Sequence, residues 1–293
     1  SDWSSDVCSS DLPLDNHLIL RMNGAGNEIL VLDLRGEDYI LPPQEACAIG
    51  AQPGLHFDQL MVLHDPISLK DDAFMRIYNL DGSQSAACGN GTRCVAFVLA
   101  REGKTKLHLE TQAGQIRTYQ LTDTIFTVDM GPPRLNWHEI PLAFATDTLN
   151  VKLIPAILDA PTHFSAVSMG NPHAIFFVED INLIDLEKIG PLIERHSLFP
   201  QRVNVSFAQI INLAEIQLRV WERGTGVTKA CGSAACAALV AAARSKRSGH
   251  EALIRLPGGD LQIKWRQDNN VEMTGPVEFE FETRLNKNFL GTT

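Results

Sequence analysis

The chain contains two copies of one sequence pattern, separated by about half its length. The stretch ACGNGTRCVAFVLA at residues 87–100 returns in similar form as ACGSAACAALVAAA at residues 230–243. The first cysteines of the two stretches, Cys88 and Cys231, are 143 residues apart (231 − 88). Four further pairs of matching positions keep this interval to within two residues and stand in the same order: Asn27 and Asn171, Gln59 and Asn204, Asn79 and Glu222, Gly131 and Gly275. An interval kept by five landmarks indicates an internal duplication, so the fold is expected to be built from two related units.

The hydrophobic pattern is similar in the two copies. In each copy it predicts a first strand directly after a Gly-Asn pair, then a helix, then short alternating strands, then the helix that follows the Cys-Gly pair. The ranges are 29–34, 43–50, 59–64 and 74–79 in the first copy, and 174–178, 183–196, 203–212 and 217–222 in the second. The helix after each cysteine is apolar on almost every side, which is typical of a helix buried inside a curled sheet. We therefore predict an α+β fold of two pseudo-symmetric, duplicated domains, each a mixed β-sheet or barrel around a central helix, with the active site in the cleft between them.

The duplication also predicts where the domains divide. The first half takes residues 13–132 and the second takes residues 133–275, while the segment 276–293 lies beyond the second copy and is expected to return to the first half. Residues 1–12, SDWSSDVCSSDL, lack the basic start and apolar centre of a secretory signal. They resemble the translation of sequencing-adapter read-through, so we interpret them as a non-native segment and leave Cys8 out of the functional interpretation.

Charge and cysteine content narrow the class of partner. The 293 residues carry a formal net charge of -10, and Lys and Arg are scattered, so no basic patch predicts binding to nucleic acid or to an anionic membrane. The apolar run from Ala234 to Ala243 is far short of the roughly 20 residues that a membrane-spanning helix needs. Six cysteines without a CxxC pair are too few for a disulfide framework. We expect a cytoplasmic protein with reduced thiols and a small-molecule substrate.

Cys88 and Cys231 predict acid/base chemistry. If the two halves are related by a pseudo-twofold axis, equivalent residues near that axis face each other across the cleft. A thiol at a helix N-terminus lies in a positive field, which lowers its pKa and favours the thiolate. One cysteine is then expected to act as a base and the other, still protonated, as an acid. Removal of a proton from one face of a carbon and delivery of a proton to the other face inverts that carbon.

The residues after each cysteine suit a carboxylate. Gly89 and Asn90 in the first copy, and Gly232 and Ser233 in the second, are expected to leave backbone N–H groups open at two helix N-termini, where anions bind. A substrate α-carboxylate held there would lie beside both thiols. The same N–H groups would stabilise the negative charge that develops on loss of the α-proton. This interpretation needs neither a cofactor nor a metal.

The cysteines have alternative interpretations. Cys47, Cys94 and Cys236 are interpreted as small hydrophobic residues, because a buried cysteine is usually one. Facing thiols at Cys88 and Cys231 would also suit a redox protein, although their separation lacks the CxxC pattern. A zinc site is a weaker alternative, because the Cx5C and Cx4C pairs would have to converge without other ligand residues nearby.

Four motifs resemble those of the diaminopimelate epimerase family, in order and spacing: NLDGSQSAACGNGTRC, MGNPHAIFFVED, RVNVSFAQI and WERGTGVTKACGSAAC. The resemblance runs from about residue 18 to about residue 285. It implies a duplicated fold in which each domain wraps a sheet round a central helix. It also implies interconversion of LL- and meso-2,6-diaminopimelate in lysine and peptidoglycan precursor synthesis. We expect a homodimer, which is common for such enzymes.

The resemblance implies a role for each matching residue. Cys88 and Cys231 would be the catalytic acid and base, and Gly89, Asn90, Gly232 and Ser233 would hold the reacting carboxylate. The other implied substrate-binding positions are Asn27, Gln59, Asn79, Asn171, Asn204, Glu222 and Arg223. Since the distant end of diaminopimelate is itself an amino-acid zwitterion, Arg223 suits its carboxylate and the amides suit its orientation. His173 and Glu222 would orient or tune the thiols.

The chain departs from the family pattern in a few places. Asn23 and Glu28 stand in NGAGNEI where many members have histidine and aspartate, His56 stands where many have glycine, and Val227 stands where an acidic residue is common. These differences bear on loop shape and rate rather than on the chemistry. The related two-cysteine proline racemases and hydroxyproline epimerases are the alternative enzymes. Their smaller ring substrates leave no role for Arg223 and the amides, so they rank second.

Overall fold

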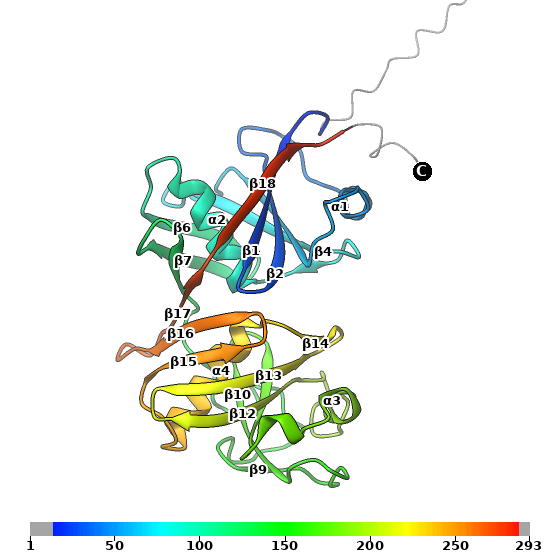
Figure 1. Ribbon diagram of the computed structural model, residues 1–293, viewed down its shortest axis with the longest axis vertical. Helices are drawn as coiled ribbons and strands as arrows, with labels where there is room; N and C mark the ends of the chain where they lie inside the picture. The colour runs from blue at the N-terminus through cyan, green and yellow to red at the C-terminus, as the bar shows by residue number, and fades with distance from the viewer. Residues whose placement is uncertain (1–13, 287–293) are drawn as a thin grey trace, which may run out of the picture.

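Strands wrapped around one helix form each of the two lobes that Figure 1 shows stacked along the long axis of the molecule. The computed structural model describes residues 14–286. The first lobe contains β1 (Leu18–Gly24), β2 (Asn27–Asp33), α1 (Pro43–Gly50), β3 (Gln59–His64), β4 (Ala73–Asn79), β5 (Gln84–Ser85), α2 (Gly89–Ala100), β6 (Lys106–Thr111), β7 (Gly114–Gln120) and β8 (Ile125–Asp129). The elements that follow are β9 (Val151–Lys152), β10 (His163–Ser168), β11 (Pro172–Phe177), the 3-10 helix η1 (Ile181–Leu183), α3 (Leu186–Glu194), β12 (Asn204–Asn212), β13 (Glu215–Glu222), β14 (Gly226–Thr228), α4 (Gly232–Arg244), β15 (Glu251–Leu256), β16 (Gly259–Trp265), β17 (Val271–Pro276) and β18 (Glu278–Arg284).

The strand pairings of the two lobes repeat each other. β2 lies parallel to β3 as β11 lies parallel to β12, and the antiparallel pairs β3–β4 and β12–β13 come next. β4 then pairs in parallel with β6, as β13 does with β15. The predicted duplication and the predicted α+β fold are therefore confirmed by the topology.

Two details of the predicted element order are wrong. The strand after each Gly-Asn pair is not the first of its lobe, because β1 and β10 precede β2 and β11 and pair with them in antiparallel ladders. The helix predicted over residues 183–196 is shorter and spans only α3. Its start is set by the Asp185 carboxylate, which accepts a hydrogen bond from the Lys188 N–H and caps the helix, while η1 forms a separate turn before it.

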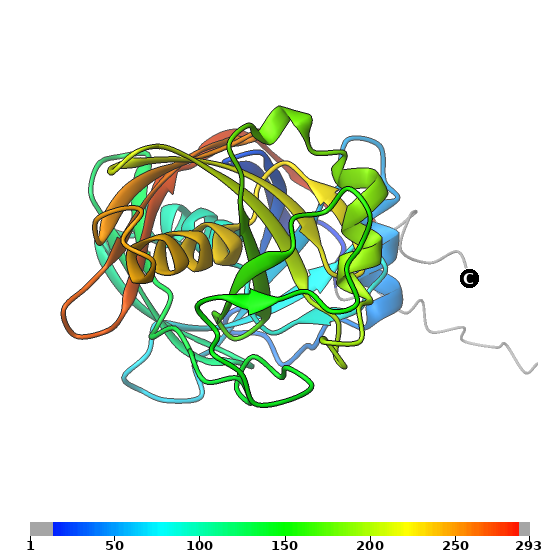
Figure 2. The same cartoon turned by 90° about the horizontal axis from the view of Figure 1, so that it is seen from below.

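A central helix lies inside each sheet, and Figure 2 shows α4 surrounded by the strands of its lobe. Every residue from Ala234 to Ala242 is buried. The small alanine side chains let strands approach the helix from several sides, with Val167 and Ile216 among the buried residues around it. Ile77 and Leu109 pack in the corresponding cluster around α2. Burial of apolar surface at about 25 cal/mol per Å² stabilises both arrangements.

The two lobes share a ladder at the waist between them. β8 pairs antiparallel with β17, and Thr127 Oγ1 lies 2.7 Å from Thr274 Oγ1 across this ladder. The two strands carry equivalent motifs of the duplication, so the pairing lies on the pseudo-twofold axis. The chain changes lobe on both sides of the ladder: β18 pairs with β1, and Arg134, just after β8, forms a bridge to Ser168 of β10. Figure 1 shows β18 in red, running from the waist along the first lobe.

The division of the chain at residues 132 and 133 stays a prediction. The β1–β18 pairing supports the predicted return of the C-terminal segment to the first half, as far as residue 286. The interpretation of residues 1–12 as a non-native segment lies outside the described residues.

Candidate active site

A cavity of about 330 Å³ opens between the lobes, where both central helices begin. Its lining includes most of the predicted site residues: Asn27, Gln59, Cys88, Gly89, Asn90, Asn171, Glu222, Arg223, Cys231, Gly232 and Ser233. Segments from both copies of the duplicated pattern thus meet in one place.

The two cysteines occupy equivalent positions in this cavity. Each is the N-cap of its helix in extended backbone conformation, with φ -148° and ψ 102° at Cys88 and φ -139° and ψ 106° at Cys231. The Cys88 thiol donates to Gln59 Oε1 at 2.6 Å, and its sulfur accepts from the Gly91 N–H at 3.2 Å. Cys231 Sγ lies 3.5 Å from Ser233 Oγ. Both thiols are free.

Glycine follows each cysteine because a side chain would collide with the residues packed there. A Cβ atom on Gly89 would lie 2.5 Å from Met273 Cε and 3.0 Å from Met130 Sδ. A Cβ atom on Gly232 would lie 2.6 Å from Met273 Sδ. The first N–H groups of an α-helix have no acceptor within the helix, and the bare glycines leave them accessible beside the cavity. This arrangement suits a carboxylate.

The polar residues two positions after the cysteines are held in the same way in the two halves. Asn90 Nδ2 donates to Asn27 Oδ1 in the first half. Asn171 Nδ2 donates to Ser233 Oγ at 3.2 Å in the second. Each Gly-Asn motif therefore fixes a polar side chain at the start of the central helix of its own half.

Burial outweighs the field of the helices in setting the ionisation of the thiols. It raises the pKa of Cys88 to about 11, opposed by the Gly91 N–H and Arg93, while the charge of Glu222 adds to the rise. Burial, followed by the charge of Glu222, also raises the pKa of Cys231. The predicted lowering of the thiol pKa is therefore wrong for the site without substrate, because removing a thiolate from water outweighs the amide donors around it.

Glu222 and Arg223 bring an acidic and a basic side chain to the cavity wall. Burial raises the pKa of Glu222, although the hydroxyl of Thr228 and the thiol of Cys231 favour its charged form. Arg223 is exposed, its Nη1 donates to Gln201 O at 2.9 Å, and it forms no ion pair with any residue from 14 to 286. An arginine without an acidic partner at the cavity edge is available to a substrate carboxylate.

Three predicted site residues do not line the cavity: Asn79, Asn204 and His173. Asn79 Nδ2 donates to Ser83 Oγ at 3.0 Å, within a turn. Asn204 is buried, and its Oδ1 accepts from the Arg223 N–H at 2.8 Å, so it supports the arginine from behind. Neither asparagine is placed to touch a ligand in the cavity as it stands.

His173 is fully buried behind Asn171. Its Nε2 lies 2.9 Å from Asn171 Oδ1, and its Nδ1 has no hydrogen-bond partner. Burial, followed by the charge of Arg223, lowers the pKa of His173 to about 3, so the ring is neutral at neutral pH. A neutral ring can donate only from Nε2 here, so His173 orients the Asn171 side chain and supplies no charge to the thiols.

The sequence pattern missed the apolar part of the cavity lining. Met130 and Met169 line the cavity, together with small residues such as Ala87 and Ala230. Both methionines stand beside glycine, in the motifs VDMGPP and MGNPHAIFFVED that align the two halves. A signal was therefore present, but periodicity cannot show which side chain turns into a cleft.

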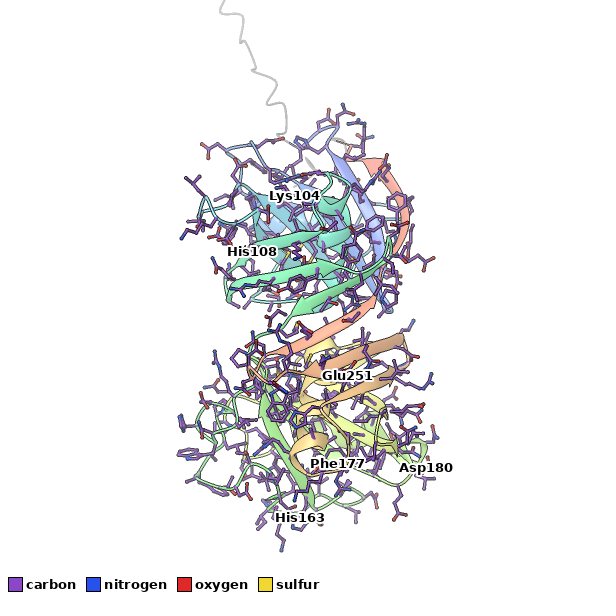
Figure 3. All side chains as sticks on the ribbon, turned by 90° about the vertical axis from the view of Figure 1, so that its left-hand side faces the viewer. Lys104, His108, His163, Phe177, Asp180 and Glu251 are labelled. Atoms are coloured by element: carbon purple, nitrogen blue, oxygen red, sulfur yellow. The ribbon has the colours of Figure 1, made fainter. Side chains whose placement is uncertain are left out.

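A larger hollow of about 730 Å³ contains none of the predicted residues, and its lining includes His163, Phe177 and Arg244. Figure 3 shows His163 and Phe177 in the second lobe, away from the waist. Among residues 14–286, no group of three or more His, Cys, Asp or Glu side chains is placed to hold a metal ion. No helix in the same range is long and apolar enough to cross a membrane.

Sequence comparison finds one family in both halves of the chain. The model of the family described as "Diaminopimelate epimerase" matches residues 20–136 and 165–280. A diaminopimelate epimerase of Methylobacterium sp. (strain 4-46) is 56% identical over 283 residues, covering 93% of this chain and 96% of the relative. One of Rhodopseudomonas palustris (strain BisB18) is 50% identical over 277 residues, with 93% and 96% covered.

Solved structures share the fold at much lower identity. A hydroxyproline epimerase from Agrobacterium vitis, solved with bound trans-4-hydroxy-L-proline, has a TM-score of 0.67 at 16% identity, covering 92% of each chain. A PhzF-family phenazine biosynthesis protein from Bacillus anthracis has a TM-score of 0.64 at 14% identity, covering 92% of this chain and 99% of that one. These likenesses show the fold alone. The family match in both halves, with relatives at 50–56% identity over almost their whole length, shows that the chain belongs to the diaminopimelate epimerase family.

Proposed function

We propose that the chain is a cofactor-independent epimerase that interconverts LL- and meso-2,6-diaminopimelate. The observation that carries this proposal is the pair of free thiols at Cys88 and Cys231, each the N-cap of a central helix, which line one cavity from opposite halves. The family match and the relatives named diaminopimelate epimerase support the choice of substrate.

The reaction starts when one cysteine, as the thiolate, removes the α-proton. The C–H bond breaks, an S–H bond forms, and the electron pair moves into the α-carboxylate. The thiol of the other cysteine then delivers its proton to the opposite face of the same carbon. Its S–H bond breaks, a new C–H bond forms, and the configuration is inverted. No electron is gained or lost, and the second cysteine ends as the thiolate.

Two sources of positive potential would stabilise the negative charge on the α-carboxylate and on the thiolate. The N–H groups of Gly89, Asn90, Gly232 and Ser233 would meet the charge that develops on the α-carboxylate, with no need to reorient during the reaction. The substrate ammonium group places a full positive charge near the sulfurs. Its field favours a thiolate and so acts against the burial that raises the pKa of each thiol.

The remaining predicted residues would hold the distant amino-acid end of the substrate. Arg223 suits its carboxylate, and Asn27, Gln59 and Asn171 offer amide donors and acceptors in the cavity. Asn204 and His173 would act through Arg223 and Asn171. Asn79, which lies outside the cavity, would reach the substrate only after the lobes close around it.

We also propose that the enzyme works in the cytoplasm, in the synthesis of lysine and of peptidoglycan precursors. We propose that it is a homodimer without a metal, a nucleic acid or a membrane partner. Two catalytic thiols that must stay reduced support a reducing compartment.

A hydroxyproline epimerase activity is the second candidate, because a solved enzyme of that name shares the fold. Incubation of the reduced enzyme in heavy water with LL-diaminopimelate, proline or trans-4-hydroxyproline distinguishes the two by mass spectrometry of the α-carbon. Deuterium in diaminopimelate alone is the expected result. Deuterium in a ring substrate instead would overturn the specificity, and exchange in none of the three would overturn the acid/base chemistry.

A further inference from the structure

Arg93 is a fully buried cation without an acidic partner. It lies in α2, five residues after Cys88, and none of its surface is exposed. Its Nη1 donates to Asn90 Oδ1 at 3.0 Å and lies 3.5 Å from Met273 Sδ. Its Nε and Nη2 have no hydrogen-bond partner, and no carboxylate of residues 14–286 forms an ion pair with it. A buried charge without a partner is strongly destabilising, so a functional reason for Arg93 is expected.

The space around Arg93 is shaped to hold a guanidinium. A Cβ atom on Gly275 would lie 3.2 Å from Arg93 Cζ and 3.3 Å from Nε, so glycine is what leaves room for the side chain. The nearby groups that bear on its charge are thiols: Cys94, Cys88 and Cys236. The guanidinium therefore lies among groups that can become negative and among none that is permanently negative.

The charge is present in only one half of the duplication. The position 143 residues after Arg93, which matches it in the second half, holds Cys236. Of the residues that differ between the two helix starts, only Arg93 carries a charge, so the cation distinguishes the Cys88 side of the site from the Cys231 side.

The charges that face the two thiols also differ. Cys88, the N-cap of α2, meets the neutral amide of Gln59 from β3 and the Gly91 N–H of that helix, and the charge of Arg93 also acts on it. Cys231 of α4 meets Ser233 and the Ala234 N–H of its own helix, and Glu222 from β13 interacts with its side chain. Glu222 also acts on Cys88, through its charge alone. Cys94, the further titratable group near Cys88, is a buried thiol.

Resting on the proposed epimerase site, we propose that Arg93 is a positioning residue that holds Asn90 and stabilises the thiolate of Cys88, so that Cys88 loses its proton more readily than Cys231. The contact to Asn90 Oδ1 fixes a residue whose N–H faces the substrate carboxylate. The unpartnered Nε and Nη2 supply a positive potential that a thiolate uses and a neutral thiol does not. In agreement with this placement, the charge of Arg93 acts to lower the pKa of Cys88.

Site-resolved alkylation of the substrate-free enzyme tests this inference without any turnover of diaminopimelate. The protein is exposed to short pulses of iodoacetamide between pH 7 and pH 12.5, because the pKa of Cys88 is raised to about 11, and mass spectrometry gives the alkylation rate of Cys88 and of Cys231 separately. The midpoint of each rate profile is compared, rather than the absolute rate, because the two thiols differ in exposure. We expect the midpoint of Cys88 to be the lower one. A lower midpoint for Cys231 would overturn the inference while leaving the epimerase proposal untouched.

The variants are Arg93→Met, Arg93→Lys and Arg244→Met. Arg93→Met removes the charge, and we expect the Cys88 midpoint to rise by about one pH unit or more, while that of Cys231 moves less. Arg93→Lys restores the charge and should restore the Cys88 midpoint. Arg244→Met is the matched control, because it removes a partly buried arginine from the far end of the other central helix.

Turnover supplies an independent readout. In Arg93→Met, kcat/KM near pH 7 should fall about tenfold for every pH unit by which the Cys88 midpoint rises, and the deficit should narrow as the pH passes the midpoint of the unmodified enzyme. A purely structural role for Arg93 would lower kcat/KM at every pH alike, and this result would overturn the inference. Equal changes in the midpoints of both cysteines would do the same. If neither Arg93 variant folds, the unmodified enzyme tests the inference by itself: a lower midpoint for Cys88 supports it, and a lower midpoint for Cys231 overturns it.

Discussion

Replacement of Gly232 by alanine tests whether the open helix start is needed. The added Cβ atom would lie 2.6 Å from Met273 Sδ and 3.3 Å from Asn90 Oδ1. Ordinary non-bonded contacts between heavy atoms are about 3.5–4.0 Å, so the overlap with the methionine sulfur is about 1 Å. Because a methionine side chain can move, we expect a moderate overpacking penalty of about 1–3 kcal/mol.

The larger effect of Gly232→Ala should fall on turnover. The methyl group would stand beside the N–H groups proposed to hold the α-carboxylate, and the displaced Met273 also packs against Gly89 and Arg93. Loss of one preorganised donor of this kind reduces kcat by about 10²–10³-fold. We therefore expect kcat/KM to fall by at least about a hundredfold, while the melting temperature falls by about 3–10 °C.

The assay combines thermal melting with the initial rate of α-deuterium exchange. Gly249→Ala is the matched control, because the nearest atom to its added Cβ would be Glu251 O at 4.0 Å, and neither quantity should change. A Gly232→Ala enzyme with unchanged kcat/KM would refute the role assigned to the helix start. So would a loss of activity no greater than the fraction of unfolded protein explains.

Cys88→Ser and Cys231→Ser should each reduce epimerisation by about 10²–10⁴-fold with the fold intact, and an unchanged Cys88→Ser rate would end the acid/base assignment. Because burial raises the pKa of both thiols, kcat/KM should increase with pH above neutrality, and a pH–rate profile that falls there would exclude a thiolate base. The folded protein also holds the Cys88 proton more tightly than the unfolded chain does. The free energy of unfolding should therefore decrease as the pH rises from about 8.5 towards about 11. Urea titrations on either side of that range would measure this decrease. Oxidation that joins Cys88 to Cys231 should abolish activity until a reductant is added; full activity of the disulfide form would contradict the mechanism. A non-reactive substrate analogue should draw the lobes together, and small-angle scattering that records no compaction would contradict closure.

The main features of the fold could be predicted because the duplication is written in residues with little freedom. A side chain at Gly89 or Gly232 would crowd Met273, and each cysteine precedes a helix whose apolar faces have to be covered. These constraints place the same element order in both halves. They also predict most of the cavity lining. Because the interval between the two copies stays nearly constant, matching residues take matching places in the two halves.

The remaining features depend on tertiary contacts that no local pattern encodes. Whether Asn79 and Asn204 reach the cavity is decided by side-chain direction, and both turn to local partners instead. The predicted thiol ionisation is wrong because a helix terminus is visible in the sequence, whereas the depth of burial is not. Arg93 has the sequence setting of an ordinary helix residue, and only the packing of β17 against α2 shows that its charge is enclosed.

The exchange of chain ends at the waist means that neither half is complete by itself. A fragment ending near residue 132 would lack β18, so one side of β1 would present unpaired backbone groups to solvent and invite aggregation. An ancestor with a single copy and the same strand pairing could complete its sheet only by exchanging a strand with a second molecule, as a domain-swapped dimer. Duplication would then have converted an assembly whose stability depends on protein concentration into one polypeptide that folds by itself at any dilution.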